Sequence, residues 1–323
     1  MARSDRATVT LELAFTPPYD WNSMIAFLAA RAIPTVEVVE DERYRRTIDI
    51  EGRHGTIEVV PGGRGDALTA TIRFPEASAV PPIVGRIRRV FDLDTDVGPM
   101  SAHLSADPVL APLVAARPGL RVPGAWDGFE LAVRAMLGQQ ITLSGARLLI
   151  GRLVEAHGER LHARSRGEAA GLSMVFPTTE RVASADLTRL GMPRARAAAI
   201  SAMAAVAGGD PDLFRPDGSL DAAIARLTAL PGVGDWTAHY VAMRALRDPD
   251  AFPAADVGLL RAMAGPDGLR PTLAALLARA ERWRPWRAYA AQHLWTELAA
   301  GGAKLRESRL LPNDAGDVRM PLS

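Results

Sequence analysis

The sequence predicts an α+β protein in which an N-terminal antiparallel sheet with two helices precedes an all-helical half. In the first part, short runs alternate between apolar and polar residues, as half-buried strands do. From Pro99 onward, apolar residues recur at helical intervals and no convincing strand remains. A chain of 323 residues with 48% hydrophobic content can bury two or three cores. We therefore expect an N-terminal domain at 1–98, a helical core at 99–303 and a polar C-terminal tail at 304–323, to which we assign no function.

Each element of the N-terminal domain has its own signal. Alternation at period two marks the strands, and apolar residues three and four apart mark the helices. The expected strands are 7–15, 35–40, 47–51, 55–60 and 67–74, and the expected helices are 21–32 and 80–91. The glycine-rich segment 61–65 is expected to form a loop between two of the strands.

The helical half is expected to contain amphipathic helices and one helical hairpin. The amphipathic helices are 127–137, 143–156, 194–207 and 286–299. In the hairpin, 220–246, two short helices flank the loop Leu230-Pro231-Gly232-Val233-Gly234. Pro231 cannot continue the first helix, and the glycines permit a tight turn. The second helix then starts with unpaired N–H groups at the positive end of its dipole, which suits a phosphate.

A single carboxylate follows the hairpin and has two interpretations. Pro253 interrupts the second helix, and Asp256 stands at the start of the next apolar run. An aspartate in that place is a good N-cap. Beside a loop that holds a DNA backbone, it can also act on a sugar. Both interpretations can hold together. The hairpin loop taken alone is more typical of an ordinary helix connection than of a phosphate site.

Charge and composition exclude several classes of protein. The net charge of +1 argues against a general polyanion binder, so a DNA-facing surface has to come from local clusters. One such cluster is Arg279, Arg282, Arg284 and Arg287, for which a solvated helix face is the commoner interpretation. The lack of a long apolar segment or a secretory signal predicts no membrane association and a cytoplasmic location. The six histidines lack metal-ligand spacing and are expected at the surface.

The hairpin followed by a proline-containing loop and Asp256 resembles the helix-hairpin-helix and Gly/Pro-Asp signature of base-excision DNA glycosylases. Other segments, collinear along the chain, resemble the bacterial 3-methyladenine DNA glycosylase II family. They are TPPYDW (16–21), FLAAR (27–31), RPGLR (117–121), MLGQQ (136–140), LGMP (190–193) and WRPWR (283–287). The resemblance runs from about residue 15 to residue 298 and implies a helix-hairpin-helix glycosylase core.

The resemblance implies a monomeric, monofunctional glycosylase that acts on double-stranded DNA carrying alkylated bases such as 3-methyladenine and 7-methylguanine. Asp256 takes the place of the family's essential aspartate, and Ala255 leaves it as the sole carboxylate of its loop. Because the chain has no cysteine, it cannot hold the iron–sulfur cluster of the endonuclease III branch, and no cofactor is expected. Lyase activity requires a lysine amine. The corresponding hairpin position is Trp236, and the only lysine is Lys304.

The resemblance also assigns residues to a base pocket and to the gap that a flipped base leaves in the DNA. The base pocket comprises Phe27, Gln139, Trp236, Tyr240 and Trp295. Aromatic rings attract a cationic alkylated purine, so such a pocket is expected to accept several damaged bases. Core packing is the alternative for each ring. Gln140 matches the position of an apolar wedge in some relatives, but it is polar here, and a solvated helix junction is its alternative.

The hairpin residues complete the expected site. The phosphate-binding hairpin comprises Leu230, Pro231, Gly232, Val233, Gly234 and Thr237. By resemblance, the backbone carbonyls of Thr228, Leu230 and Val233 are expected to hold a monovalent cation, Na⁺ or K⁺.

Two other functions stay open. A non-catalytic DNA-binding protein could keep the hairpin, although Asp256 argues against it. A monofunctional glycosylase for uracil, hypoxanthine or mismatched thymine could share the scaffold, although the segment 16–21 and the α+β domain favour alkylated bases.

Overall fold

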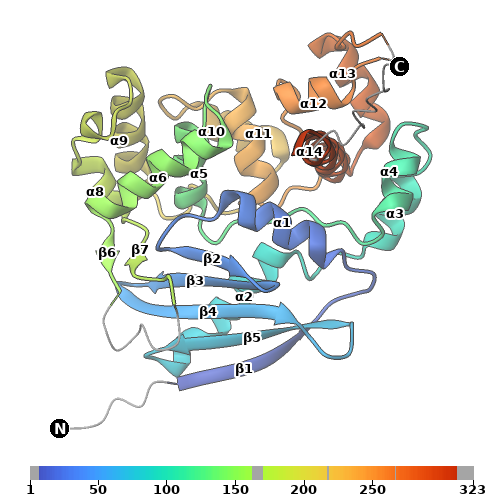
Figure 1. Ribbon diagram of the computed structural model, residues 1–323. Coiled ribbons are helices and arrows are strands. Elements are labelled where there is room, and N and C mark those ends of the chain that lie inside the picture. The colour runs from blue at the N-terminus through green and yellow to red at the C-terminus, as the bar shows by residue number, and fades with distance from the viewer. Residues whose placement is uncertain (1–6, 162–169, 217, 266, 311–323) are drawn as a thin grey trace, which may run out of the picture.

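The N-terminal part of the computed structural model is a five-stranded antiparallel sheet with the strand order β1-β5-β4-β3-β2 (Figure 1). The strands are β1 (Ala7–Ala14), β2 (Glu37–Glu40), β3 (Arg43–Ile50), β4 (Arg53–Pro61) and β5 (Ala67–Phe74). Residues 7–161, 170–216, 218–265 and 267–310 are described by the structure. Buried residues alternate with less buried ones along β5, as period-two patterning requires. The predicted antiparallel sheet is confirmed.

The two predicted N-terminal helices are α1 (Trp21–Arg31) and α2 (Val80–Phe91). Asp20 caps α1, because its carboxylate accepts the Ser23 N–H at 3.0 Å. Proline in the first turn of α2 suits a position where no N–H partner is needed. In Figure 1, α1 lies on the side of the sheet that faces the helical half, and this placement brings its residues towards the predicted site.

Helices dominate the second half of the chain, as predicted. They are α3 (Val97–Leu104), α4 (Leu110–Ala116), α5 (Gly128–Leu137), α6 (Leu143–His157), α8 (Thr179–Ser184), α9 (Arg194–Gly209), α10 (Leu220–Thr228), α11 (Asp235–Arg244), α12 (Val257–Ala262), α13 (Leu273–Ala280) and α14 (Arg287–Leu310). Short 3-10 segments occur at Ala77–Ala79, Leu187–Leu190 and Glu281–Trp283. The helix α5 is buried on most of its surface, which places it at the centre of the helical half.

Two expectations about this half were wrong. A two-stranded ladder, β6 (Glu159–Arg160) with β7 (Met174–Val175), occurs where no strand was expected. Strands of two residues are too short to show alternation, and this ladder depends on a distant partner, because Ser173 N–H donates to Thr35 O at 2.8 Å. The helix α14 also continues to Leu310, so helix replaces the first residues of the expected tail at 304–323. The rest of that tail, 311–323, lies outside the described residues.

The molecule has two hydrophobic cores. One lies between the sheet, α1 and α2 and includes Phe27, Tyr44 and Phe91. The other fills the helical half and also takes in Ile33 and Val36, which follow α1. The second core therefore anchors the C-terminal end of α1, although α1 belongs to the first domain.

Four charged side chains, which we call the interdomain ion network, join the two halves; three of them are buried and the fourth, Arg134, is half-buried. Glu37 and Arg46 come from β2 and β3, whereas Glu130 and Arg134 come from α5. Arg46 donates to Glu130 at 2.7 Å, and Arg134 donates to Glu130 at 2.9 Å and to Glu37 at 3.0 Å. Burial alone raises the pKa of Glu37, but the guanidiniums of Arg134 and Arg46 lower it to about 2. Glu37 therefore stays ionised at neutral pH and can hold both arginines.

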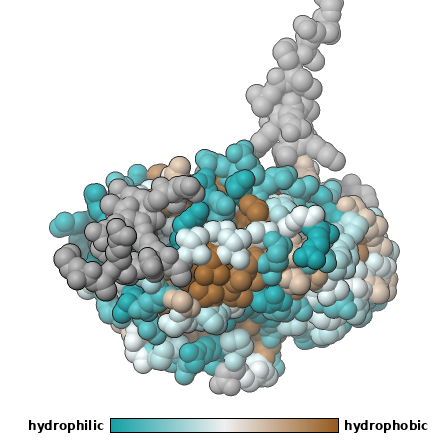
Figure 2. Space-filling model, turned by 90° about the horizontal axis from the view of Figure 1, so that it is seen from below, coloured by the Kyte–Doolittle hydropathy of each residue, from teal (hydrophilic) through white to brown (hydrophobic). Residues whose placement is uncertain are grey.

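The surface seen from below Figure 1, on the side of β1, is mainly hydrophilic around one apolar area (Figure 2). Within the part of the chain that the structure describes, no helix is both long enough and apolar enough to cross a membrane.

Candidate active site

The hairpin forms as predicted, with α10 and α11 joined by the loop at 229–234. Gly232 has a φ of +75°, and a β-carbon there would lie 2.7 Å from the Ala199 β-carbon, so the turn requires glycine. No side chain caps α11 at Gly234. The Ala238 N–H donates to Gly234 O at 2.9 Å, which leaves the N–H groups of the first turn pointing out of the helix. This end of α11 can receive an anion.

The hairpin is fastened to the turn between α5 and α6 by Gln139. The side-chain amide of Gln139 donates to Gly232 O and to Thr237 Oγ1, both at 3.1 Å. Arg196 donates to the backbone carbonyl of Gln139 at 2.9 Å. The Thr237 side chain is buried, so its hydroxyl faces the interior and only its backbone belongs to the helix end. The structure thus places Gln139 against the hairpin loop.

The next residue, Gln140, is exposed at the tip of this turn. Its φ is +60°, a left-handed conformation that a long side chain rarely adopts. Because Gln139 and the N-cap Thr142 fix the turn on both sides, the backbone holds Gln140 outward. Ile141 beside it is 38% exposed, which adds an apolar side chain to the same tip.

Of the three carbonyls expected to hold a cation, the one of Leu230 already accepts the Val233 N–H at 3.1 Å. All three carbonyls belong to the C-terminal end of α10 and its loop. The ion itself stays a prediction.

Asp256 is held by three donors. It is the N-cap of α12, and its Oδ1 accepts the Leu259 N–H at 3.0 Å. The indole N–H of Trp295 also donates to Oδ1, at 2.8 Å, and that of Trp236 donates to Oδ2, at 2.9 Å. Gly258 leaves room for this arrangement, because a β-carbon there would lie 2.7 Å from Oδ1. Both interpretations of Asp256 are therefore compatible, since the cap and the two indoles orient the carboxylate together.

The aromatic residues predicted for the base pocket lie near Asp256, although they come from distant parts of the sequence. The Trp236 and Tyr240 rings stack with centroids 5.2 Å apart, and the Tyr240 and Trp295 centroids are 6.2 Å apart at 65°. The Trp236 and Tyr240 rings already lie face to face on each other, so no base can lie between them in this arrangement. These rings have to separate, or expose an outer face, before a base can stack on them.

Phe27 joins this group through two arginines that we did not single out in the sequence. The guanidinium of Arg244 lies 4.7 Å from the Phe27 centroid and 5.3 Å from that of Tyr240, and it donates to the Tyr240 hydroxyl at 2.7 Å. The guanidinium of Arg31 lies 3.7 Å above the Phe27 ring. Each arginine follows its aromatic partner by four residues on a helix, and this spacing is a signal that could have identified both.

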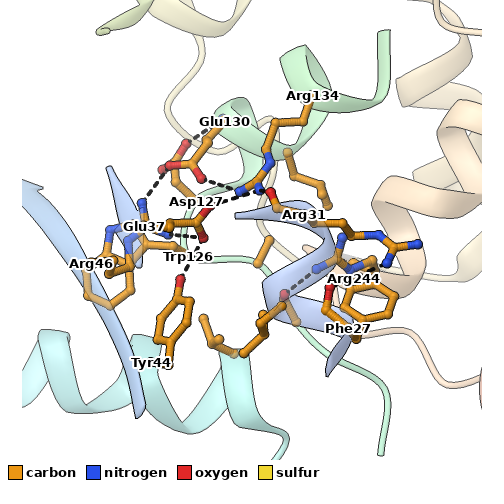
Figure 3. Close-up of a pocket in the computed structure, with 15 residues that line it drawn as sticks. Phe27, Arg31, Glu37, Tyr44, Arg46, Trp126, Asp127, Glu130, Arg134 and Arg244 are labelled. Carbon is orange, nitrogen blue, oxygen red and sulfur yellow. Dashed lines mark hydrogen bonds and ion pairs between the residues drawn. The ribbon is translucent and has the colours of Figure 1, made fainter. Parts of the chain in front are cut away.

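The interdomain ion network lies directly beside these arginines (Figure 3). Arg134, on α5, donates to the backbone carbonyl of Arg31 at the end of α1. The small interior cavity between the network and Phe27 has a volume of about 20 Å³, enough for roughly one water molecule. The wall that carries Phe27 is therefore held against the helical half by buried charges.

Three arginines of the cluster at 279–287 pair with carboxylates of the protein. Arg287 is buried and donates to both Asp250 carboxylate oxygens at 2.8 and 2.9 Å. Arg279 pairs with Asp107 at 2.8 Å, and Arg284 pairs with Asp250 and Glu281. The expected solvated surface was wrong for Arg287, which is buried, whereas Arg284 is exposed and Arg279 is half-buried, and each of the three pairs with a carboxylate.

The expected surface location was also wrong for two of the five histidines that the structure describes, and His162 lies outside the described residues. His54 and His293 are buried, and burial lowers the pKa of His293 to about 4. The helical neighbours of His293 are apolar only towards the N-terminus, Tyr289 and Ala290, because Thr296 and Glu297 follow on the other side, so periodicity alone did not indicate an interior position. Within the described ranges, no group of three or more potential ligands is arranged to bind a metal.

Comparison with known proteins identifies relatives of this chain. A family model described as the AlkA N-terminal domain matches residues 10–127. The chain is 35% identical to the DNA-3-methyladenine glycosylase 2 of Escherichia coli, over 88% of this chain and 95% of that protein. It is 38% identical to a probable bifunctional transcriptional activator/DNA repair enzyme AlkA of Mycobacterium tuberculosis, over 92% of this chain but only 58% of that longer protein.

A solved structure has the same fold. The 3-methyladenine DNA glycosylase of Archaeoglobus fulgidus superposes with a TM-score of 0.75 at 23% identity, covering 90% of this chain and 98% of that one.

Proposed function

The chain belongs to the AlkA family of DNA-3-methyladenine glycosylases, and on that premise we propose that it is a monofunctional DNA glycosylase for alkylated purines. It would take 3-methyladenine and 7-methylguanine from double-stranded DNA, hydrolyse the N-glycosidic bond and leave an abasic site. The observation that carries this proposal is the carboxylate of Asp256, oriented by Trp236 and Trp295 beside a helix end suited to a phosphate.

The chemistry follows from the position of that carboxylate. When the bond between C1′ and N9 breaks, its electron pair leaves with the base and the deoxyribose gains oxocarbenium character. A fixed carboxylate stabilises this charge without reorganising. Water then adds to C1′, and the proton it loses passes to Asp256 or to solvent. The two indole donors hold the carboxylate in place while this happens.

Access to the bond requires the damaged base to leave the DNA stack. Flipping costs a few kcal/mol, and it costs least for a damaged base. The uncapped N–H groups at the start of α11 would hold a backbone phosphate, with a monovalent cation on the carbonyls of Thr228, Leu230 and Val233. Gln140, held outward by its turn, would occupy the gap and hydrogen-bond the orphaned partner base.

The enzyme would select damaged bases through stacking on its aromatic rings and through the lability of their glycosidic bonds. Trp236, Tyr240 and Trp295 offer aromatic faces to a cationic purine, worth about 0.5–2 kcal/mol each. Because stacking reads no hydrogen-bond code, we expect several alkylated bases to be accepted, with the weakest glycosidic bond cleaved fastest.

Lyase activity is not part of the proposal. A lyase needs an amine that forms a Schiff base with the sugar. The helix that begins beside the phosphate loop carries Trp236 at the relevant position, and the only lysine of the sequence is Lys304.

The test is a product analysis. The purified protein would be incubated with duplexes that carry 7-methylguanine, 3-methyladenine, uracil or no lesion, and free base and strand breaks would be measured before and after alkali. We expect release of the alkylated bases and breaks only after alkali. Release of uracil alone would favour the glycosylase for another lesion, and binding without release would favour a non-catalytic protein. Breaks without alkali would contradict the absence of lyase activity.

A further inference from the structure

Two positive charges lie at one end of the candidate base pocket. The guanidinium of Arg31 donates to the Phe27 carbonyl at 3.4 Å, and Arg244 donates to the Pro123 carbonyl and to the Tyr240 hydroxyl. Among the described residues, neither arginine forms an ion pair with a carboxylate. We call Phe27, Arg31 and Arg244 the base end of the pocket.

The nearest carboxylates are already engaged. Glu37 and Glu130 bind Arg46 and Arg134 of the interdomain ion network, so they do not neutralise the base end. The positive field also reaches Tyr240, for which burial raises the pKa but Arg244 and Arg31 lower it below the ordinary value.

The opposite end of the pocket is negative. Asp256, with Trp236 and Trp295, forms what we call the sugar end, and Tyr240 contacts both tryptophan rings. Tyr240 also binds Arg244, so the contacts run in order from the carboxylate through the aromatic rings to the guanidiniums. A base placed among these rings would have a negative charge on one side and two positive charges on the other.

Cleavage of the N-glycosidic bond moves positive charge from the base to the sugar, that is, from the base end of the pocket towards the sugar end. A cationic purine such as 7-methylguanine takes the electron pair of the bond and leaves neutral, while the positive charge passes to the sugar. A neutral purine such as hypoxanthine takes the same electron pair and leaves as an anion, which then gains a proton from solvent. In both cases the base loses one unit of positive charge and the sugar gains it.

We propose that the guanidiniums of Arg31 and Arg244 act on the departing base, drawing the bonding electrons towards it while Asp256 stabilises the charge on the sugar. The proposal rests on the glycosylase function proposed above. For a cationic base it has a distinctive consequence: the same guanidiniums repel the bound substrate and favour its cleavage. A residue that only supports the fold would not have opposite effects on binding and on rate.

Arg31 is the better residue to test. Arg244 also holds the carbonyls of Pro123 and Gly124, so its loss would leave buried acceptors unpaired. Arg31→Met removes the charge and keeps an unbranched side chain, whereas Arg31→Lys keeps the charge. Arg86→Met is a matched control, because Arg86 also lies over an aromatic ring, 5.4 Å from the Trp126 centroid, but outside the base end.

The experiment measures single-turnover base release against enzyme concentration, with duplexes containing 7-methylguanine or hypoxanthine. For Arg31→Met we expect the maximal rate to fall about tenfold on both bases. The half-saturating enzyme concentration should fall for 7-methylguanine but not for hypoxanthine. Arg31→Lys should restore both parameters towards the wild type, and Arg86→Met should leave both unchanged.

Several results would overturn the proposal. One is an unchanged rate of base release in Arg31→Met. Another is a lower rate accompanied by weaker binding of both bases. The third is a wild type that releases 7-methylguanine but no hypoxanthine. A wild type that releases neither these bases nor 3-methyladenine would overturn the proposed function itself. Active wild type with an unaffected Arg31→Met would overturn only the role of the guanidiniums.

Discussion

The sugar end and the base end of the pocket are held by different kinds of interaction. At the sugar end, two indole N–H groups and one backbone N–H orient Asp256, and all of them belong to the helical half. At the base end, the helix that carries Phe27 and Arg31 belongs to the N-terminal domain and is fixed by Arg134 of α5, which donates to the Arg31 carbonyl and pairs with Glu37. Neutral donors can orient the carboxylate without further charges, whereas the base end depends on correct docking of two domains.

Of the changes that test the difference between the two ends, breaking the interdomain ion network should have the largest effect. Arg134→Met leaves the buried carboxylates of Glu37 and Glu130 without one partner, and removal of one member of a buried pair typically costs about 3–5 kcal/mol. We expect the free energy of unfolding in urea to fall by about that amount. In the folded fraction, release of 7-methylguanine should also slow, because the Arg31 carbonyl loses its partner.

Arg43→Met, which removes an exposed pair with Glu58, serves as the control and should change the free energy of unfolding by less than about 1 kcal/mol. Equal effects of the two variants would contradict the role given to the network.

A smaller effect is expected at the sugar end from Trp236→Phe. This change keeps an aromatic ring but removes the donor to Asp256 Oδ2. We expect the single-turnover rate to fall about tenfold, since a hydrogen bond to a charged group is worth roughly 1.5–3 kcal/mol. Trp283→Phe is the matched control, because the Trp283 indole also donates to a carboxylate, that of Asp107, at 2.9 Å. It should lower stability and leave the rate of folded enzyme unchanged, and a comparable loss of rate would remove the special role of Trp236.

As the pH falls, interactions near the sugar end should lose stability at a higher pH than those near the base end. His293 lies on α14, two residues before Trp295, and its pKa of about 4 is below the ordinary value of about 6.5 because the ring is buried. Between these values the unfolded chain binds more protons, so stability falls as the pH falls from about 6.5 towards 4.

Glu37 has a pKa of about 2 in the folded protein, so its contribution to stability is lost only as the pH falls below about 4.5 towards 2.

The free energy of unfolding in urea should therefore be lower at pH 5 than at pH 7 for the wild type, and this loss should be smaller in His293→Gln. An equal loss in both would show that His293 is not responsible.

The smallest effect is expected from Gln140→Ala, which alters neither end of the pocket. Its side chain is exposed, so the melting temperature should stay within about 1 °C of the wild type. Base release should slow by only a few-fold, through poorer filling of the DNA gap. Leu148→Ala, at an apolar side chain that is 57% exposed on α6, is the control and should leave release unchanged. A loss above a hundredfold in Gln140→Ala would instead place Gln140 in the chemistry.

The hairpin and Asp256 could be predicted from sequence because their signals are local, whereas Trp236 and Trp295 were assigned only through the family resemblance. Pro231, Gly232 and Gly234 mark the hairpin, and the N-cap pattern marks Asp256 within one helix of it. The strands of the sheet were predictable for the same reason, since alternation is read within a few residues. The ladder of β6 and β7 was missed because two residues cannot show alternation.

The base end could not be derived in full from the sequence. The i, i+4 spacing of Phe27 with Arg31 and of Tyr240 with Arg244 is visible there, but not the approach of the two pairs to each other. The ion network connects residues 84 and 97 positions apart, and no local pattern reports such pairing. The same limit explains why Arg287, buried against Asp250, was first assigned to a surface cluster.

The central claim is that Asp256 stabilises the charge that develops on the sugar. The most direct measurement is the single-turnover rate of 7-methylguanine release by Asp256→Asn, together with its affinity for the same duplex. The amide keeps an oxygen that can cap α12 and accept an indole N–H, but it removes the negative charge. We expect the rate to fall by about 10²–10³-fold with the affinity for DNA nearly unchanged. A rate within a few-fold of the wild type would contradict the claim.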